Sequence, residues 1–116
     1  DKILPLADLM RSAWNKGDKV IICTARVLSL WDHVFLADND LRAHAILSRA
    51  EGDTRKDDVM KRALLLKHFK DLGIPFARWT RNAVFYDDNK NVLKMAAKLG
   101  IIARDAVQLN AQMGAR

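Results

Sequence analysis

The sequence predicts an α/β fold in which a parallel sheet is flanked by helices. Apolar stretches of strand length alternate along the chain with longer segments whose apolar residues recur at helical spacing. The stretch Val20-Ile21-Ile22-Cys23 is apolar at four consecutive positions, which is typical of a strand buried on both faces. Because the chain has 116 residues and no evident linker or repeat, we expect a single domain over residues 1–116.

Each predicted element rests on a local pattern. Helices are expected at residues 5–16, 28–44, 57–72 and 92–99, and glycines that commonly end helices follow three of them, Gly17, Gly73 and Gly100. Strands are expected at residues 19–24, 45–48, 83–86 and 105–109, with a polar loop at 50–56. Residues 76–79 fit neither pattern, so their structure is left open.

Composition limits the kind of protein. Hydrophobic residues make up 50% of the chain and charged residues 29%, which is an ordinary globular mixture. The one cysteine, Cys23, excludes an internal disulfide and is expected in the core. The three histidines lack metal-ligand spacing. No apolar run is long enough to cross a membrane and no signal peptide is visible, so we expect a cytoplasmic protein without a membrane partner.

The formal net charge of +6 leaves two interpretations open. The surface is either basic without a special role, or it meets a polyanionic partner such as nucleic acid or a nucleotide phosphate. The basic residues are spread along the chain and form no charged tail. Trp79, beside Arg78 and near Arg81, is the tryptophan to test for stacking on a base, although packing in the core is the commoner role.

Two polar clusters follow predicted strands. The carboxyl ends of parallel strands meet at one edge of a sheet, where Thr24-Ala25-Arg26 and Asp87-Asp88-Asn89 are therefore expected. Adjacent carboxylates at a strand end suit a hard cation such as Mg²⁺, whereas the alternative is that Asp87 and Asp88 cap the next helix. Thr24 and Arg26 offer donors to a phosphate, or they are a capping threonine and a surface arginine.

The loop Gly52-Asp53-Thr54-Arg55-Lys56-Asp57-Asp58 leads into the predicted helix that carries Lys61. Lys61 lies four residues after Asp57, so the two side chains can pair on one helical face. A lysine held in this way near the sheet edge would stabilise negative charge on a phosphoryl group. The alternative is a solvated helix start that is merely rich in charge.

Together these clusters resemble the haloacid dehalogenase-like (HAD) phosphohydrolases. The strand ending in Thr24 is similar to the second motif of that family, Lys61 to the third, and the strand ending in Asp87-Asp88 to the fourth. Within the family, the eight-residue run that ends at Val59 looks most like the phosphatase domains of bacteriophage polynucleotide kinase-phosphatases, and Thr24-Ala25-Arg26 is similar to their Ser-Gly-Arg. The resemblance implies a three-layer, Rossmann-like (Rossmannoid) fold.

The resemblance also implies a chemistry. In these enzymes an aspartate attacks phosphorus to form an aspartyl-phosphate, and a second aspartate two residues later acts as general acid and base. By resemblance, Thr24 and Lys61 are the expected catalytic residues, and Asp87 and Asp88 the expected Mg²⁺ ligands. Substrate-binding roles are expected for three residues, Arg26, Arg55 and Asp57. The substrate would be a nucleotide or the 3′-phosphate end of a polynucleotide.

The first motif of the family, Asp-x-Asp after an apolar strand, has no counterpart in this chain, so the first strand of the sheet is expected to be lacking. Asp38 and Asp40 do not follow a buried strand and are not assigned as nucleophile. Three explanations stay open: an N-terminal segment lies outside this chain, the chain is an inactive relative that binds phosphate or nucleic acid, or self-association replaces the strand. The first is favoured.

Overall fold

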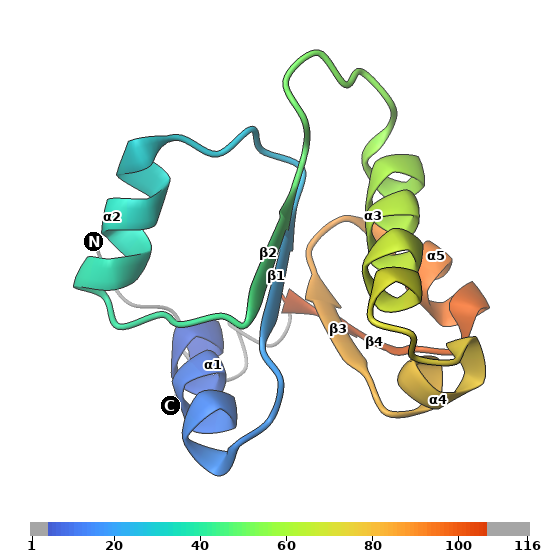
Figure 1. Cartoon of the computed structure of the whole chain (residues 1–116), viewed down its shortest axis with the longest axis horizontal. Coiled ribbons are helices and arrows are strands. Elements are labelled where there is room, and N and C mark those ends of the chain that lie inside the picture. The colour runs from blue at the N-terminus through green and yellow to red at the C-terminus, as the bar shows by residue number, and fades with distance from the viewer. Residues whose placement is uncertain (1–4, 107–116) are drawn as a thin grey trace. The chain divides into compact units, whose positions relative to one another are not determined.

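The structure, a computed structural model, describes residues 5–106 of the chain. In this part, five helices and four short strands alternate along the sequence. The chain divides into two compact units, one up to Asp53 and the other beginning at Thr54, and each unit is described by itself (Figure 1). The alternation of helices with parallel strands confirms the α/β class that the sequence predicts.

The first unit contains α1 (Pro5–Lys16), β1 (Ile21–Thr24), α2 (Leu30–Asp38) and β2 (Ala45–Ser48). The two strands form a two-stranded parallel sheet in which Thr24 pairs in register with Ser48. The sheet is tied to α1 through His44, whose Nδ1 accepts the backbone N–H of Val20 at 2.9 Å. The His44 ring stacks on Trp14 of α1 with 4.4 Å between ring centroids.

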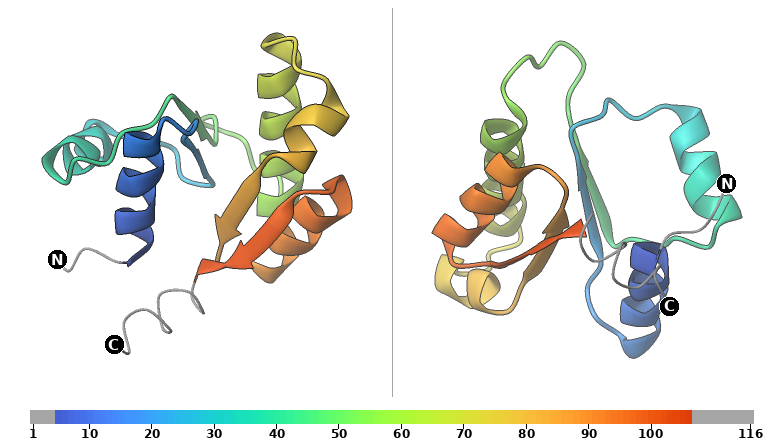
Figure 2. Two further views of the ribbon diagram at one scale, coloured as in Figure 1. Left: turned by 90° about the horizontal axis from the view of Figure 1, so that it is seen from below. Right: turned by 180° about the vertical axis from the view of Figure 1, so that it is seen from behind.

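The second unit contains α3 (Asp57–Asp71), α4 (Phe76–Arg81), β3 (Val84–Asp87), α5 (Lys90–Leu99) and β4 (Ile102–Asp105). Its two strands also form a parallel pair, in which Asp87 is in register with Asp105. Helix α5 packs on both strands, and α3 packs on α5 and on α4 (Figure 2). This packing places the helix that carries Lys61 in the same unit as the strand that ends in Asp87.

The hydrophobic core of the second unit lies among α3, α4, α5 and the strands. Its buried apolar side chains are Met60, Leu65, Trp79, Val92, Met95, Ala96, Leu99, Ile101 and Ala106. Trp79 is buried and stacks on Phe69 with 4.3 Å between ring centroids. The suggestion that Trp79 stacks on a nucleic-acid base is therefore wrong, because its ring faces are used in the core.

Most of the predicted elements are confirmed within one to three residues of their ends. The predicted helix at residues 57–72 is α3, the one at 92–99 is α5, and Gly100 adopts a left-handed φ of +95° at its C-cap. Residues 76–79, which the sequence patterns leave open, lie in the short helix α4 at residues 76–81. None of the helices in the described part of the chain has the length and apolar character needed to cross a membrane.

The predicted helix at residues 28–44 is much shorter, because α2 ends at Asp38. Asn39 stops the helix by donating its side-chain N–H to the carbonyl of Phe35, and Asp40 adopts a left-handed φ of +54°. The apolar side of α2 is also exposed: Leu30 and Trp31 are 73% and 77% exposed, and no residue of α2 is buried.

Two further expectations are corrected. The apolar run in β1 is not buried on both faces, since only Val20 is buried and Cys23 is half-buried. Among the described residues of its unit, β1 pairs only with β2, and a sheet of two strands covers little of its own surface. The last strand is Ile102–Asp105 rather than 105–109, because pairing with β3 begins at Ile102, opposite Val84. Residues 107–109 lie outside the described part.

Met60 tests the core of the second unit, because it is fully buried while its neighbour Val59 is half exposed. We expect Met60→Ala to lower the free energy of unfolding by about 2–5 kcal/mol, since a cavity replaces the side chain. Val59→Ala should change it by about 0.5 kcal/mol or less. Chemical denaturation of both variants measures the difference, and equal effects would contradict this description of the core.

Candidate functional site

A buried ion pair joins α3 to the end of β3. The Nζ of Lys61 lies 2.6 Å from Oδ2 of Asp87, and the two side chains are only 8% and 6% exposed. Charges removed from water are tolerated in a protein only when each is paired and hydrogen-bonded. Lys61 and Asp87 therefore hold each other in place, and they fix the position of α3 against the carboxyl end of β3.

The segment after β3 orients the second oxygen of Asp87. Oδ1 of Asp87 accepts the backbone N–H of Asn89 at 2.9 Å. Asn89 is the N-cap of α5, and its side chain accepts the N–H groups of Asn91 and Val92. Asp87 and Asp88 therefore do not cap α5, because Asn89 is its N-cap.

Asp88 is exposed, and the structure shows no hydrogen bond or ion pair for its carboxylate among the described residues. A further carboxylate, Asp105, is in register with Asp87 at the carboxyl end of β4. The sequence pattern predicts a strand that begins at Asp105, so Asp105 is not among the metal ligands expected from the sequence. The signal that would have found it is the apolar pair Ile101-Ile102, because β4 begins at Ile102 and ends at Asp105.

The donor set at this strand end fits a magnesium ion in part. Each oxygen of Asp87 has one protein partner and keeps a further lone pair, while Asp88 keeps all of its acceptor capacity. No group of three or more acidic, histidine or cysteine side chains suited to a metal is found among residues 5–106. Mg²⁺ is commonly bound by one or two carboxylates together with water and substrate phosphate, and the two aspartates match that pattern.

Thr24 and Arg26 lie in the first unit, directly after β1. Oγ1 of Thr24 accepts the backbone N–H of Arg26 at 3.2 Å, which leaves its hydroxyl hydrogen for another acceptor. The mostly exposed guanidinium of Arg26 forms an ion pair with Asp32 at 2.9 Å. The backbone N–H of Ser29, with the Arg26 charge as a smaller cause, holds the pKa of Asp32 below its ordinary value.

Arg49 fixes the loops that follow β1 and β2, and the sequence analysis did not single it out. Its guanidinium donates to the carbonyl of Ala25 at 2.7 Å and to the carbonyl of Asp53 at 2.9 Å. Its backbone N–H donates to the carbonyl of Arg26. No local sequence pattern marks such a residue, because its guanidinium reaches the carbonyl of Ala25, 24 residues away, only when β1 and β2 are paired.

Of the residues selected from the sequence, the structure brings Lys61 and Asp87 into direct contact. Asp57 is half-buried in the first turn of α3, and its predicted pairing with Lys61 stays a prediction. Arg55 lies exposed in the loop before α3. Thr24 and Arg26 belong to the first unit and the other selected residues to the second, so their joint action is a matter for experiment.

In sequence, the chain is similar to phage nucleotide-phosphatase-like proteins. The chain belongs to the bacteriophage T5 5′-deoxynucleotidase family, whose sequence model matches residues 1–115. A relative, the 5′-deoxynucleotidase of Escherichia phage T5, is 29% identical over 130 aligned residues, which cover 95% of this chain and 50% of that protein. The chain thus spans about half the length of the curated relative that it matches.

A solved structure has a similar fold. One chain in the structure of the Pnkp1/Rnl/Hen1 RNA repair complex matches with a TM-score of 0.71 and 24% sequence identity. The match covers 87% of this chain and 31% of that chain. At this identity the likeness concerns the fold.

The buried ion pair can be tested against an exposed one on the same helix. Lys67 and Asp71 of α3 form an ion pair at 2.7 Å, but their side chains are 76% and 60% exposed. We expect Lys61→Met to lower the free energy of unfolding by about 3–5 kcal/mol, because Asp87 is left buried without its cation. Lys67→Met should cost about 0.5 kcal/mol or less.

A double-mutant cycle separates the pair from other effects of each substitution. Combining Lys61→Met with Asp87→Asn should give a coupling energy of about 1–3 kcal/mol in denaturant unfolding. The matched cycle with Lys67→Met and Asp71→Asn should give about 0.3–0.5 kcal/mol. Equal coupling energies would show that burial does not strengthen the Lys61–Asp87 interaction.

Proposed function

We propose that this chain is part of a Mg²⁺-dependent phosphomonoesterase that removes a phosphate from nucleotides. The observation that carries the proposal is the buried Lys61–Asp87 pair at the carboxyl end of a parallel strand, followed at once by the exposed carboxylate of Asp88. Membership in a 5′-deoxynucleotidase family supports a nucleotide as the substrate.

The proposal includes the finer fold. We assign the chain to a HAD-like arrangement, a three-layer fold whose parallel sheet is flanked by helices. The parallel strands, the helices that follow them and the acidic pair after β3 support this assignment. None of the four described strands is followed by Asp-x-Asp, so the first strand of that arrangement has no counterpart among them.

Lys61 and the acidic pair would act on the phosphate. Lys61 carries three N–H donors, and one of them is used by Asp87. The remaining donors would stabilise the negative charge that develops on the transferring phosphoryl group. Asp87 and Asp88 would hold Mg²⁺ directly or through water, and the bound ion would supply charge stabilisation to the phosphate oxygens.

Thr24 and three further residues would bind the substrate. Thr24 would donate its remaining hydroxyl hydrogen to a phosphate oxygen. Arg26 would have to exchange its ion pair with Asp32 for a phosphate, which is feasible because its guanidinium is mostly exposed. Arg55 and Asp57 lie before and at the start of α3, and we assign them to substrate binding by their match to the family pattern.

The nucleophile of this chemistry would be an aspartate outside this chain. Within the chain, Asp38 and Asp40 are spaced as Asp-x-Asp, but they lie at the end of α2 rather than after a strand. The nucleophilic aspartate would attack phosphorus to form an aspartyl-phosphate, while a second aspartate donates a proton to the leaving nucleoside oxygen. The second aspartate would then accept a proton from water, which hydrolyses the aspartyl-phosphate and releases inorganic phosphate.

A second candidate function is a binding module without catalysis. The lack of an Asp-x-Asp after any described strand and the net charge of +6 favour it. Such a module would bind phosphate or nucleic acid in a salt-dependent manner and would hydrolyse nothing. The two candidates differ in one readout, the Mg²⁺-dependent release of phosphate by the intact gene product.

Two substitutions test the proposed roles in the intact gene product. We expect Asp88→Asn to raise the Mg²⁺ concentration that gives half-maximal activity by about tenfold or more, because a ligand is weakened. Lys61→Met should lower kcat by about 100-fold or more, measured below the unfolding transition of the variant. The matched controls are Asp71→Asn and Lys67→Met, which change exposed side chains of α3 and should leave both quantities unaltered.

The substrate is tested by comparing phosphate release from three compounds. Deoxynucleoside 5′-monophosphates should be hydrolysed fastest if the family relationship sets the specificity, and a 3′-phosphorylated oligonucleotide fastest if the polynucleotide phosphatase resemblance does. A deoxynucleoside 3′-monophosphate distinguishes the position of the phosphate from the length of the strand. No hydrolysis of any of them with Mg²⁺ present would overturn the enzyme in favour of the binding module.

A further inference from the structure

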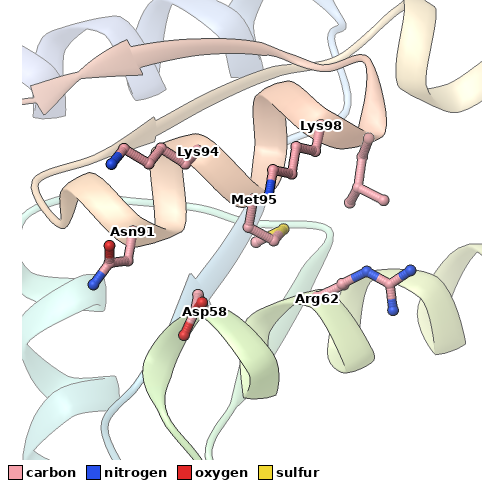
Figure 3. A pocket seen from close by; sticks show the side chains of 7 residues that line it. Asp58, Arg62, Asn91, Lys94, Met95 and Lys98 are labelled. Carbon is pink, nitrogen blue, oxygen red and sulfur yellow. The ribbon is translucent and has the colours of Figure 1, made fainter.

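A basic groove lies between α3 and α5 of the second unit. It has a volume of about 430 Å³ and is lined by Asp58 and Arg62 from α3 and by Asn91, Lys94 and Lys98 from α5, over an apolar floor of Met95 and Leu99 (Figure 3). All of these residues belong to the same unit, so the groove is formed within it. None of its cations has a role in the proposed hydrolysis.

The groove carries an excess of positive charge. Arg62, Lys94 and Lys98 contribute three cations and Asp58 one carboxylate, which leaves two positive charges. All three cations are exposed, and the structure gives them no ion pair with another side chain among the described residues. By contrast, the exposed pairs Arg42–Asp40 and Lys67–Asp71 neutralise cations elsewhere on the surface.

The cations follow a regular spacing. Two of the groove cations, Lys94 and Lys98, are four residues apart on α5, and Lys90, which does not line the groove, precedes them at the same spacing, so the three lie along one side of the helix. Four residues of helix correspond to a rise of about 6 Å, and the three lysines therefore extend over about 12 Å. A surface of this kind presents a row of charges rather than a single binding point.

We propose that this groove binds the phosphodiester backbone of a single-stranded nucleic acid. One phosphomonoester group, which is all that a mononucleotide offers, would meet only part of the row. A nucleic-acid strand carries one negative charge for each nucleotide, so more than one phosphate would face the lysines. A cationic groove over an apolar floor suits a single strand, whose backbone follows the charges.

The groove lies next in sequence to the residues of the proposed active site. Asn91 is in the first turn of α5, directly after the Asp87–Asp88–Asn89 segment, and Asp58 lies three residues before Lys61 on α3. This inference deepens the proposed function. It rests on that function only in that a nucleic-acid strand held in the groove would present its terminal phosphate for hydrolysis. Binding itself does not depend on catalysis.

The binding test uses the intact gene product and a fluorescent single-stranded oligodeoxynucleotide of about ten nucleotides. We expect the double substitution Lys94→Glu with Lys98→Glu to weaken binding at least about tenfold in fluorescence anisotropy. It should also reduce the slope of log affinity against log salt concentration by about 1.4, because two phosphate contacts with a single strand are lost. Unfolding curves of the variant establish that it is folded.

The matched control is Lys67→Glu with Lys70→Glu, which changes the net charge equally on an exposed face of α3 outside the groove. This control should change the affinity less than twofold. Equal losses in both double variants, or no loss in Lys94→Glu with Lys98→Glu, would overturn the proposal. Equally tight binding of a polyglutamate peptide or of a mononucleotide would also overturn it, since neither has a phosphodiester backbone.

A second readout keeps this inference separate from the proposed hydrolysis. Hydrolysis of a deoxynucleoside monophosphate should be unaltered by Lys94→Glu with Lys98→Glu. Below its unfolding transition, Lys61→Met should lower hydrolysis by about 100-fold or more and keep oligonucleotide binding. If the oligonucleotide binds through the groove while no substrate is hydrolysed, the proposed enzyme fails and the groove stands. If nucleotides are hydrolysed but the oligonucleotide does not bind, the groove fails and the enzyme stands.

Discussion

The buried ion pair between Lys61 and Asp87 is the constraint on which the second unit depends. It connects the second turn of α3 to the last residue of β3, and the two paired residues are 26 positions apart in the sequence. Removing either partner would leave the other side chain buried without its counterion, which is strongly destabilising. Helix α5 lies against both α3 and β3, and its packing fixes the two elements that carry the charges. The core and the candidate site are therefore stabilised by the same arrangement.

One short segment links this pair to the groove. Asp87 accepts from the lysine and from the backbone of Asn89, and Asn89 in turn caps α5, the helix that carries the groove lysines. Asp88, between the two, is left exposed to solvent. A displacement of this segment would change the carboxylates and the start of α5 together. The geometry of the candidate metal ligands is thus coupled to the position of the basic helix.

Sequence patterns predicted most of the elements but not the extent of α2, the position of β4, the burial of side chains or their long-range partners. The glycine after α5 and the apolar run of β3 depend on local preferences, which are visible in sequence. Lys61 and Asp87 were selected by the order of motifs, yet spacing along the helix suggested Asp57 as the partner of Lys61. A contact over 26 residues leaves no periodic trace, so the bond to Asp87 appears only in the folded chain. Arg49 was missed for the same reason, because its acceptors are carbonyl groups in two loops.

Helix α2 differs from the others because it has no buried residue, although it carries large apolar side chains such as Leu30 and Trp31. A helix of nine residues is marginal in water on its own propensity, and most helices in proteins are stabilised by burying an apolar face. Its local opening free energy therefore lies near the low end for this chain. The absence of buried side chains therefore implies that the backbone hydrogen bonds of α2 open more readily than those of α3 and α5, which carry buried residues.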